Sequence, residues 1–294
     1  MKSHLLFPRY FRPIGFLLAI PGLVLGYLFL FERYTIPGFG PPPIPNGMLG
    51  RLNTYTNELA LTLVVLGLMF IAFSKVKLED ELTAYIRLNA LYWAILINYL
   101  MLFAGIIFQL LFGDFNYIDA NLIMPLIIFI LRFYYLLYRN KDEYHAPSLY
   151  FLPHKPYNKI GKVLSPISLL FVISGSIILT SLGLHTTTLW DEYFYISYYI
   201  LPFILLIWVY SKERKEDEYI NAIRLNAMQK AIYVNYAILL LANFLFFGFD
   251  FLWVENCNFS TIPLIFILVF QYRLHQLSKN SEEKSNSKIT LNTL

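Results

Sequence analysis

Eight stretches of the chain carry almost no charge, and their length is the strongest constraint on the fold. They lie at about residues 13–31, 58–73, 86–112, 121–138, 163–184, 193–210, 223–249 and 260–275. A helix needs about twenty apolar residues to cross the hydrocarbon core of a bilayer. Because hydrocarbon offers no partner to backbone N–H and C=O groups, each stretch is expected to be a helix. The short alternating strands of a membrane β-barrel are not seen in the sequence.

The composition places the chain in the same class. Hydrophobic residues make up 57% of its 294 residues and charged residues only 14%, and the mean hydropathy is +0.55. Charged residues make up about a quarter of a typical soluble chain. We therefore predict an all-α integral membrane protein with eight transmembrane helices.

The distribution of basic residues predicts how the helices are oriented. If the N-terminus is cytoplasmic, every lysine and arginine except Arg33 and Arg51 falls on the inner side, and the other outer loops carry only acids. Cytoplasmic loops of membrane proteins are enriched in lysine and arginine. Both termini are therefore predicted to be cytoplasmic, in a multi-pass protein of the inner (plasma) membrane. Contact with lipid headgroups explains the net charge of +4, so no nucleic-acid partner is predicted.

One block of sequence occurs twice. Residues 74–99 read SKVKLEDELTAYIRLNALYWAILINY, and residues 211–236 read SKERKEDEYINAIRLNAMQKAIYVNY, with fourteen of the 26 aligned positions identical. The similarity continues into the next span, where Pro125 aligns with Pro263. Each half holds four predicted spans, so both halves enter the membrane from the same side. The halves are therefore predicted to be parallel four-helix repeats.

The predicted domains follow from these blocks. They are residues 1–138 as the first repeat, 139–162 as a cytoplasmic connector, 163–275 as the second repeat, and 276–294 as a disordered cytoplasmic tail. The tail is polar and low in complexity, which is typical of disorder. The first outer loop, at residues 34–47, is rich in proline and is expected to be stiff and extended.

Each copy of the block places a polar stripe on a helix. Asp80, Arg87 and Asn98 are spaced by seven and eleven residues, which returns them to one helix face. The second copy repeats this spacing. The candidate functional residues are Glu79, Asp80, Glu81, Arg87, Asn98, Glu216, Asp217, Glu218, Arg224 and Asn235.

The partner of each arginine is not evident from helical spacing. Asp80 and Arg87 are two turns apart, too far for pairing along a helix. We therefore expect each arginine to meet an acid from another segment, with the acidic triplet of the other half as one hypothesis. The stripe also has a purely structural explanation: an arginine near a helix end can extend to the interface, first-turn acids favour a helix N-terminus, and a buried asparagine can hydrogen-bond a neighbouring helix.

No residue pattern predicts catalysis or metal binding. His145 and His154 lie in the connector without the spacing of a metal site. Cys257 is the single cysteine, so neither an intrachain disulfide nor a cysteine metal site can form. Nucleophile elbows and glycine-rich nucleotide loops are absent from the sequence. We therefore predict a protein that is not an enzyme and that has no cofactor.

The second block, SKERKEDEYINAIRL, resembles a group of uncharacterised bacterial integral membrane proteins. These proteins carry an S-K-E-x-x-E-D-E stretch followed by R-L ahead of a long apolar helix. The first block departs from this pattern at Val76, where the second has Glu213. The resemblance covers the two repeat blocks and implies a bacterial, polytopic membrane protein whose motif faces the cytoplasm.

The sequence leaves two functional hypotheses open. The first is a regulatory, signalling or docking module that binds a cytoplasmic protein partner through the paired acidic and arginine motifs. The second is a transporter or channel for a neutral or apolar solute, with a path between the repeats lined by Asn98, Gln109, Asn235 and Asn243. No carboxylate lies in a span centre, and the third and seventh spans lack an internal proline or glycine pair. We therefore favour the first hypothesis.

Overall fold

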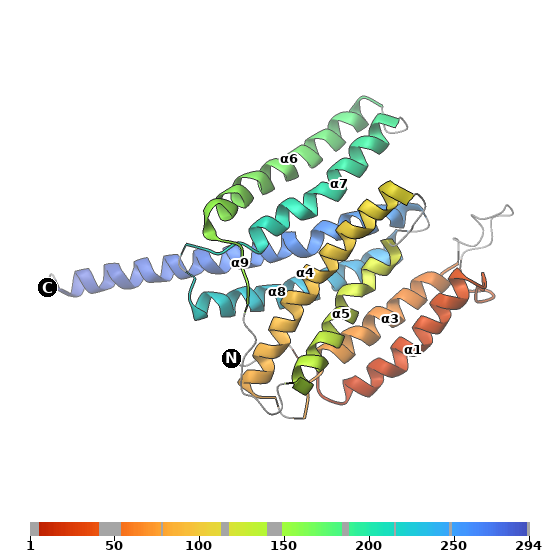
Figure 1. Ribbon diagram of the computed structural model, residues 1–294, viewed down its shortest axis with the longest axis horizontal. Coiled ribbons are helices and arrows are strands. Elements are labelled where there is room, and N and C mark those ends of the chain that lie inside the picture. Colours follow the sequence, from red (N-terminus) through yellow and green to blue (C-terminus); the bar gives the residue numbers. More distant parts are fainter. Residues whose placement is uncertain are drawn as a thin grey trace. The chain divides into compact units, whose positions relative to one another are not determined.

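The computed structural model describes residues 6–40, 54–77, 79–112, 118–139, 149–183, 188–214, 216–246 and 249–292. Residues 41–47 of the proline-rich loop and residues 140–148 of the predicted connector, including His145, lie outside these residues. The described helices are labelled in Figure 1. They are α1 (Phe11–Leu30), α3 (Thr56–Phe73), α4 (Glu81–Phe112), α5 (Ile118–Arg139), the π-helical turn η1 (His154–Asn158), α6 (Lys159–Ser181), α7 (Thr188–Val209), α8 (Glu218–Leu245) and α9 (Phe249–Asn292).

The described residues form an all-helical chain, as predicted, and each predicted span corresponds to one α-helix. Seven of these helices, all except α8, are long and apolar enough to cross a membrane. Helix α8 is less apolar because it carries polar residues such as Gln229, Asn235 and Asn243, and all three are buried. The chain thus has the helices of a multi-pass membrane protein, and the crossing of α8 stays a prediction.

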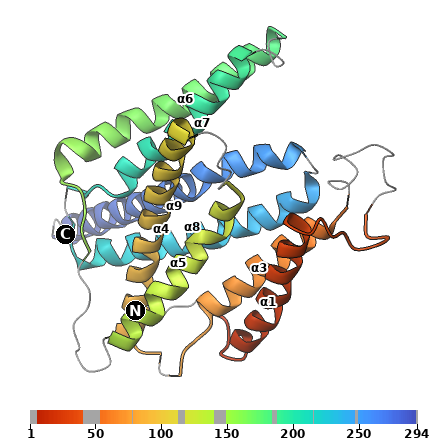
Figure 2. The same ribbon diagram turned by 45° about the vertical axis from the view of Figure 1, so that its right-hand side comes forward.

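The first compact unit consists of residues 1–149 and 236–258. In it α1 packs against α3, and α5 packs against both α3 and α4. Helices α1 and α3 lie side by side in Figures 1 and 2. This unit differs from the predicted first half because it also takes in residues from the end of α8 and the start of α9.

Helices α1 and α3 approach each other closely because small residues face each other where they meet. The buried residues of α1 are Gly15, Ala19 and Gly22. A Cβ atom added to Gly67 of α3 would lie 2.5 Å from the Ala19 backbone nitrogen and 2.7 Å from the Gly15 carbonyl oxygen. Small residues at helix contacts are typical of membrane proteins, where van der Waals packing drives helix association.

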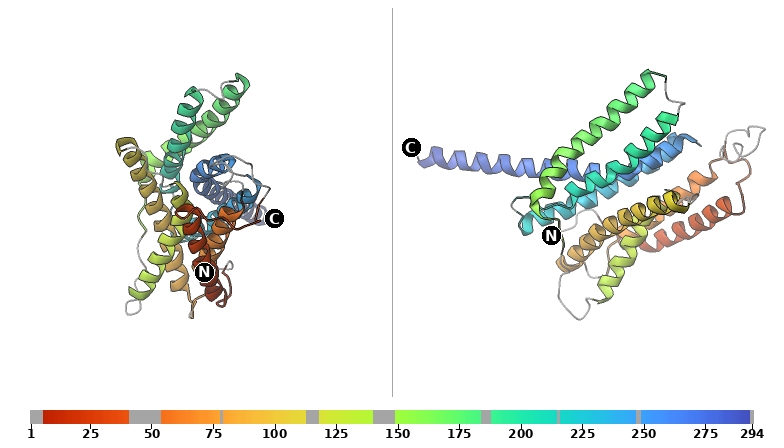
Figure 3. Two further views of the ribbon diagram at one scale, coloured as in Figure 1. Left: turned by 90° about the vertical axis from the view of Figure 1, so that its right-hand side faces the viewer. Right: turned by 45° about the horizontal axis from the view of Figure 1, so that its top comes forward.

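The second compact unit consists of residues 150–235 and 259–294. Its α6 packs against α7, and η1 contacts both helices; α6 and α7 lie side by side in Figures 1 and 3. Close packing again depends on glycine, since a Cβ atom on Gly161 would lie 2.7 Å from Cα of Trp208. Further along α6, Gly175 leaves room for Tyr193, whose hydroxyl donates to the Phe171 and Val172 carbonyls.

Helix α9 is longer than the span predicted at residues 260–275. It begins at Phe249, so Glu255, which was expected in an outer loop, is a helical residue and is only 4% exposed. It ends at Asn292, within the segment expected to be a disordered tail. No glycine or proline follows Pro263, so neither of the two strongest helix-breaking residues interrupts α9 there.

Candidate functional site

The repeated block begins where α3 ends. Ser74 follows the last residue of α3 and is extended, with φ −77° and ψ 143°. On either side of it the backbone pairs with Phe7: the Phe7 amide donates to the Phe73 carbonyl, and the Lys75 amide donates to the Phe7 carbonyl, both at 3.0 Å. The N-terminal segment before α1 is thereby attached to the end of α3.

Arg87, from the second turn of α4, reaches back to this point. Its Nη1 donates to the carbonyls of Ala72 (3.2 Å) and Ser74 (3.1 Å), and its Nη2 lies 3.1 and 2.9 Å from the two carboxylate oxygens of Glu79. The Arg87 side chain is 1% exposed and that of Glu79 is 18% exposed. We call this group of four residues the first arginine clasp.

The second unit builds the same arrangement at the end of α7. Here the Leu152 amide donates to the Tyr210 carbonyl (2.9 Å), and the Lys212 amide donates to the Leu152 carbonyl (3.0 Å), on either side of Ser211. Ser211 is the counterpart of Ser74 in the repeated block. The segment before η1 is thus attached to the end of α7.

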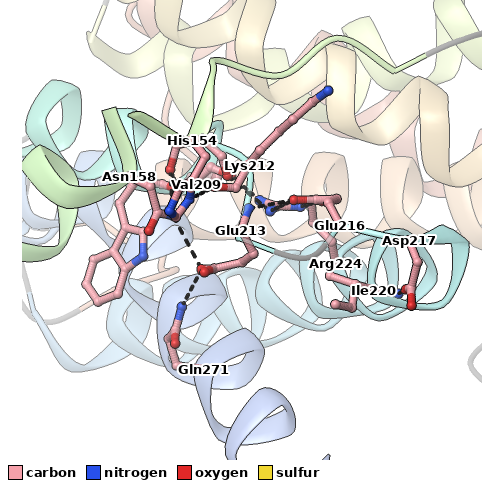
Figure 4. Close-up of polar contacts among 12 residues, drawn as sticks. His154, Asn158, Val209, Lys212, Glu213, Glu216, Asp217, Ile220, Arg224 and Gln271 are labelled. Atoms are coloured by element: carbon pink, nitrogen blue, oxygen red, sulfur yellow. Dashed lines mark hydrogen bonds and ion pairs between the residues drawn. The ribbon is translucent and has the colours of Figure 1, made fainter. Parts of the chain in front are cut away.

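Arg224 of α8 completes the second arginine clasp, together with Glu216 and the carbonyls of Val209 and Ser211. Its Nη1 donates to Val209 (2.6 Å) and its Nη2 to Ser211 (3.1 Å), while Nε and Nη2 bind the two Glu216 oxygens at 2.9 and 3.0 Å. Arg224 and Glu216 are 1% and 7% exposed. Figure 4 shows this ion pair, with Glu216 coming from the loop ahead of α8.

Aromatic rings cover both guanidinium groups. The Cζ atom of Arg87 lies 4.6 Å from the ring centre of Phe133 on α5. That of Arg224 lies 4.8 Å from the ring centre of Phe151 and 4.6 Å from that of Phe270 on α9. A cation at this distance is attracted to the negative face of the ring. The rings also exclude water, which strengthens the ion pair inside each clasp.

Each clasp satisfies backbone groups that a helix end leaves without partners. The last carbonyls of a helix have no intrahelical donor, and a positive side chain there also favours the helix dipole. The planar guanidinium group can bind a carboxylate through two donors at once. In each clasp the arginine therefore caps the preceding helix. It also holds, through the bound glutamate, the loop that leads into the helix on which the arginine lies.

The middle acid of each triplet starts the next helix. The Thr83 amide donates to Oδ1 of Asp80 (2.7 Å), and the Ile220 amide donates to Oδ1 of Asp217 (2.8 Å). Both aspartates precede the first residue of their helix and satisfy one of its free amides. Hydrogen bonds from the side chain and then the amide of Thr83 lower the pKa of Asp80.

The expected cross-pairing between the halves is wrong. Arg87 pairs with Glu79 of its own half, and Arg224 pairs with Glu216 of its own half. Helical spacing misled the prediction because α4 begins only at Glu81, so Glu79 lies in a loop that folds back towards the arginine. Two side chains eight residues apart cannot pair along one helix. They can pair when the first lies in a loop that folds back towards the start of the helix.

The remaining candidate residues lie outside the two clasps. Glu81 and Glu218 are exposed in the first turns of α4 and α8. Asn98 and Asn235 are buried, at 3% and 1% exposed. Each is eleven residues beyond its arginine, or about 16 Å along the helix axis. Neither amide atom of Asn235 has a hydrogen-bond partner among the described residues.

Sequence reasoning missed a second ion pair in the second unit. Lys162 of α6 lies 2.7 Å from Oε2 of Glu213, and Oε1 accepts from Gln271 (3.3 Å) and Asn158 (3.4 Å). Figure 4 shows Glu213 between Asn158 and Gln271. The sequence signal for this ion pair is the difference between the two blocks, where Glu213 stands in the place of Val76. The partners of Glu213 could not be inferred from it, because they come from distant segments.

Glu213 makes the second unit sensitive to acid. Burial raises the pKa of Glu213, but hydrogen bonds and charge from Lys162, with hydrogen bonds from Gln271 and Asn158, outweigh burial and lower it overall. A carboxylate whose folded-state pKa is lowered stabilises the fold above its unfolded pKa of about 4.3, and this contribution is lost as the pH falls through the folded value. Between about pH 6 and pH 3 we expect the melting temperature of Glu213→Gln to fall less than that of wild type. Parallel curves in thermal unfolding experiments would contradict this role.

In the part of the chain that the structure describes, the placement of the side chains gives no metal-binding cluster. No group of three histidine, cysteine, aspartate or glutamate side chains in this part of the chain is placed to hold a metal ion. His154 instead has Nδ1 3.0 Å from the Lys212 carbonyl. Comparisons with models of known protein families, with curated proteins and with solved structures find no significant match.

Proposed function

We propose that this chain is a non-enzymatic multi-pass protein of a bacterial inner membrane that docks a cytoplasmic protein. The observation that carries the proposal is the different use of the acids in the two triplets. Glu79 and Glu216 are held in the arginine clasps. Asp80, Asp217 and the glutamate that follows each of them are exposed. The clasps keep the exposed acids on a fixed backbone.

Each unit has a docking surface of two exposed acids at the start of a helix. The surface of the first unit comprises Asp80 and Glu81, and that of the second unit comprises Asp217 and Glu218. Complementary charge steers partners and fixes their register, so the partner that fits either surface is a soluble protein with a basic segment. The aspartate of each surface also caps its helix, which limits the motion of the surface.

The proposal includes parallel repeats with both termini in the cytoplasm. In each unit the arginine binds a glutamate eight residues earlier and carbonyls thirteen and fifteen residues earlier. The bridges at Phe7 and Leu152, and the tightly packed Gly15 and Gly161, add a second set of matching features. The basic residues favour the cytoplasm as the side that holds both clasps.

The alternative of a transporter with a polar path between the repeats receives less support. Gln109 is exposed on α4. Asn243 is occupied, since its Nδ2 donates to the Glu58 carbonyl (2.9 Å) and to the Thr62 hydroxyl (3.2 Å). Asn243, one of the four residues proposed to line the path, is therefore accounted for without a solute.

The docking function can be tested by photo-crosslinking in cells. Tyr219, next to Glu218 and 60% exposed, can be replaced by a photoreactive phenylalanine derivative. We expect a discrete adduct with one soluble protein. The adduct should disappear when Asp217 and Glu218 are changed to Asn and Gln, which keep their shape and, at Asp217, the helix cap. No adduct, or one that survives neutralisation in a normally folded variant, would refute docking at the surface of the second unit.

A further inference from the structure

The first unit contains a cavity of about 320 Å³. Its walls come from α1, α3, α5 and the first turns of α9. Gly26 of α1 and Ala60 of α3 leave the space open, because their side chains are absent or small. The cavity is about twice the size of an engineered apolar cavity that binds benzene.

The cavity opens beside exposed apolar residues of α1. Leu23, Tyr27 and Leu30 line it and are 48%, 55% and 58% exposed. All three belong to a helix that is long and apolar enough to cross the membrane. A molecule would therefore reach the cavity from the hydrocarbon of the bilayer rather than from water.

One wall of this apolar cavity carries a carboxyl group. Glu255 of α9 lines the cavity and is 4% exposed, and Asn57 of α3 adds an amide to the lining. Glu58, next to Asn57, is a second buried acid, 7% exposed, and its Oε2 has no hydrogen-bond partner among the described residues. Ionisable groups inside a membrane are costly and usually mark functional sites.

We propose that the cavity binds a single-chain amphiphile with a cationic nitrogen head, taken up from the bilayer. The alkyl chain occupies the space beside Gly22, Gly26 and Ala60, and the ammonium group pairs with the Glu255 carboxylate. The carboxylate adds a charge-assisted contact to the burial of the alkyl chain. This binding site is independent of the docking surfaces, which use acids at other helix ends.

Photolabelling in vesicles tests the proposal with two matched probes. The full-length protein is reconstituted and exposed to dodecyltrimethylammonium, or to dodecanol, each with a diazirine in the same position of the chain. Peptide mass spectrometry then locates the label. We expect the cationic probe to label residues 22–31 and 57–64 at about tenfold lower concentration than the neutral probe, because a charge-assisted contact contributes at least this factor.

Two variants separate the charge from the space. Glu255→Gln should make the two probes equivalent, while Gly26→Leu should abolish labelling by both. The Gly26 change is sterically permitted, since an added Cβ meets only the Ala60 Cβ, at 3.9 Å. Glu32→Gln, at an exposed acid outside the lining, is the control and should change nothing.

Three outcomes would overturn the proposal. Equal labelling of the wild-type cavity by both probes would mean that ordinary lipid chains fill it. Label located elsewhere would mean that the cavity is not the site. Labelling that is unchanged in Gly26→Leu would also mean that the cavity is not the binding site. The Gly26→Leu variant tests the position of the site even if Glu255→Gln fails to fold.

Discussion

Replacing Arg224 by methionine is expected to lower the free energy of unfolding by about 3 to 5 kcal/mol. The change leaves the Glu216 carboxylate, only 7% exposed, without its cation, and leaves the carbonyls of Val209 and Ser211 without a donor. Methionine keeps the length and most of the packing, so the loss reports on the charge and its hydrogen bonds. The measurement is equilibrium unfolding in mixed micelles.

Three comparisons make this prediction specific. Arg87→Met should cost less, because Glu79 is more exposed than Glu216 and is better solvated when its partner is lost. Arg214→Met removes an exposed arginine from the same loop and should have little effect. Adding Glu216→Gln to Arg224→Met should recover part of the stability by removing the buried charge. A double variant that is no more stable than Arg224→Met would contradict the clasp as an ion pair.

The second large effect is expected at Gly67. In Gly67→Leu the added Cβ would lie within 2.7 Å of backbone atoms of Ala19 and Gly15, so α1 and α3 must move apart. The buried residues of α1 all belong to this contact. We therefore expect a loss of about 3 kcal/mol or more, at or above the upper end of the cost of overpacking. Thermal unfolding in detergent measures the loss, and protease sensitivity near Phe31 reports the release of α1.

Gly26→Ala is the matched control for this helix pair. Gly26 also faces α3, but an added methyl group meets only the Ala60 Cβ, at 3.9 Å. Its stability should be unchanged or slightly higher, because alanine restricts the unfolded chain more than glycine. Both changes raise helix propensity, so equal losses for Gly67→Leu and Gly26→Ala would contradict the close approach of α1 and α3 at Gly67 as the cause.

The sequence was sufficient to predict the helices but not their polar contacts. Apolar length is a local property, so the span expected at 58–73 differs from α3 by two residues at one end. Helix α9 was predicted less well, because Glu255 interrupts the apolar run although it is buried in the fold. Whether a carboxyl group near a span end is exposed depends on neighbouring helices, which no local pattern records.

The partner of each arginine could not be predicted for a related reason. The pairing of Arg87 with Glu79 depends on where α4 starts and on how the loop before it turns. Two serines of the repeated block, Ser74 and Ser211, went unassigned because their contribution is a backbone carbonyl, which every residue type carries. The aromatic covers were also missed, since Phe133 and Phe270 are distant in sequence from the arginines that they contact.

The arginine clasps also bear on how the chain is made. The carbonyls of Ala72 and Ser74 leave the ribosome before Arg87 is synthesised, so the guanidinium group that satisfies them arrives on a later segment. Until then these carbonyls depend on water. Successive segments are therefore coupled during biogenesis: the end of α3 gains its donor only when α4 follows, and the end of α7 gains its donor only when α8 follows.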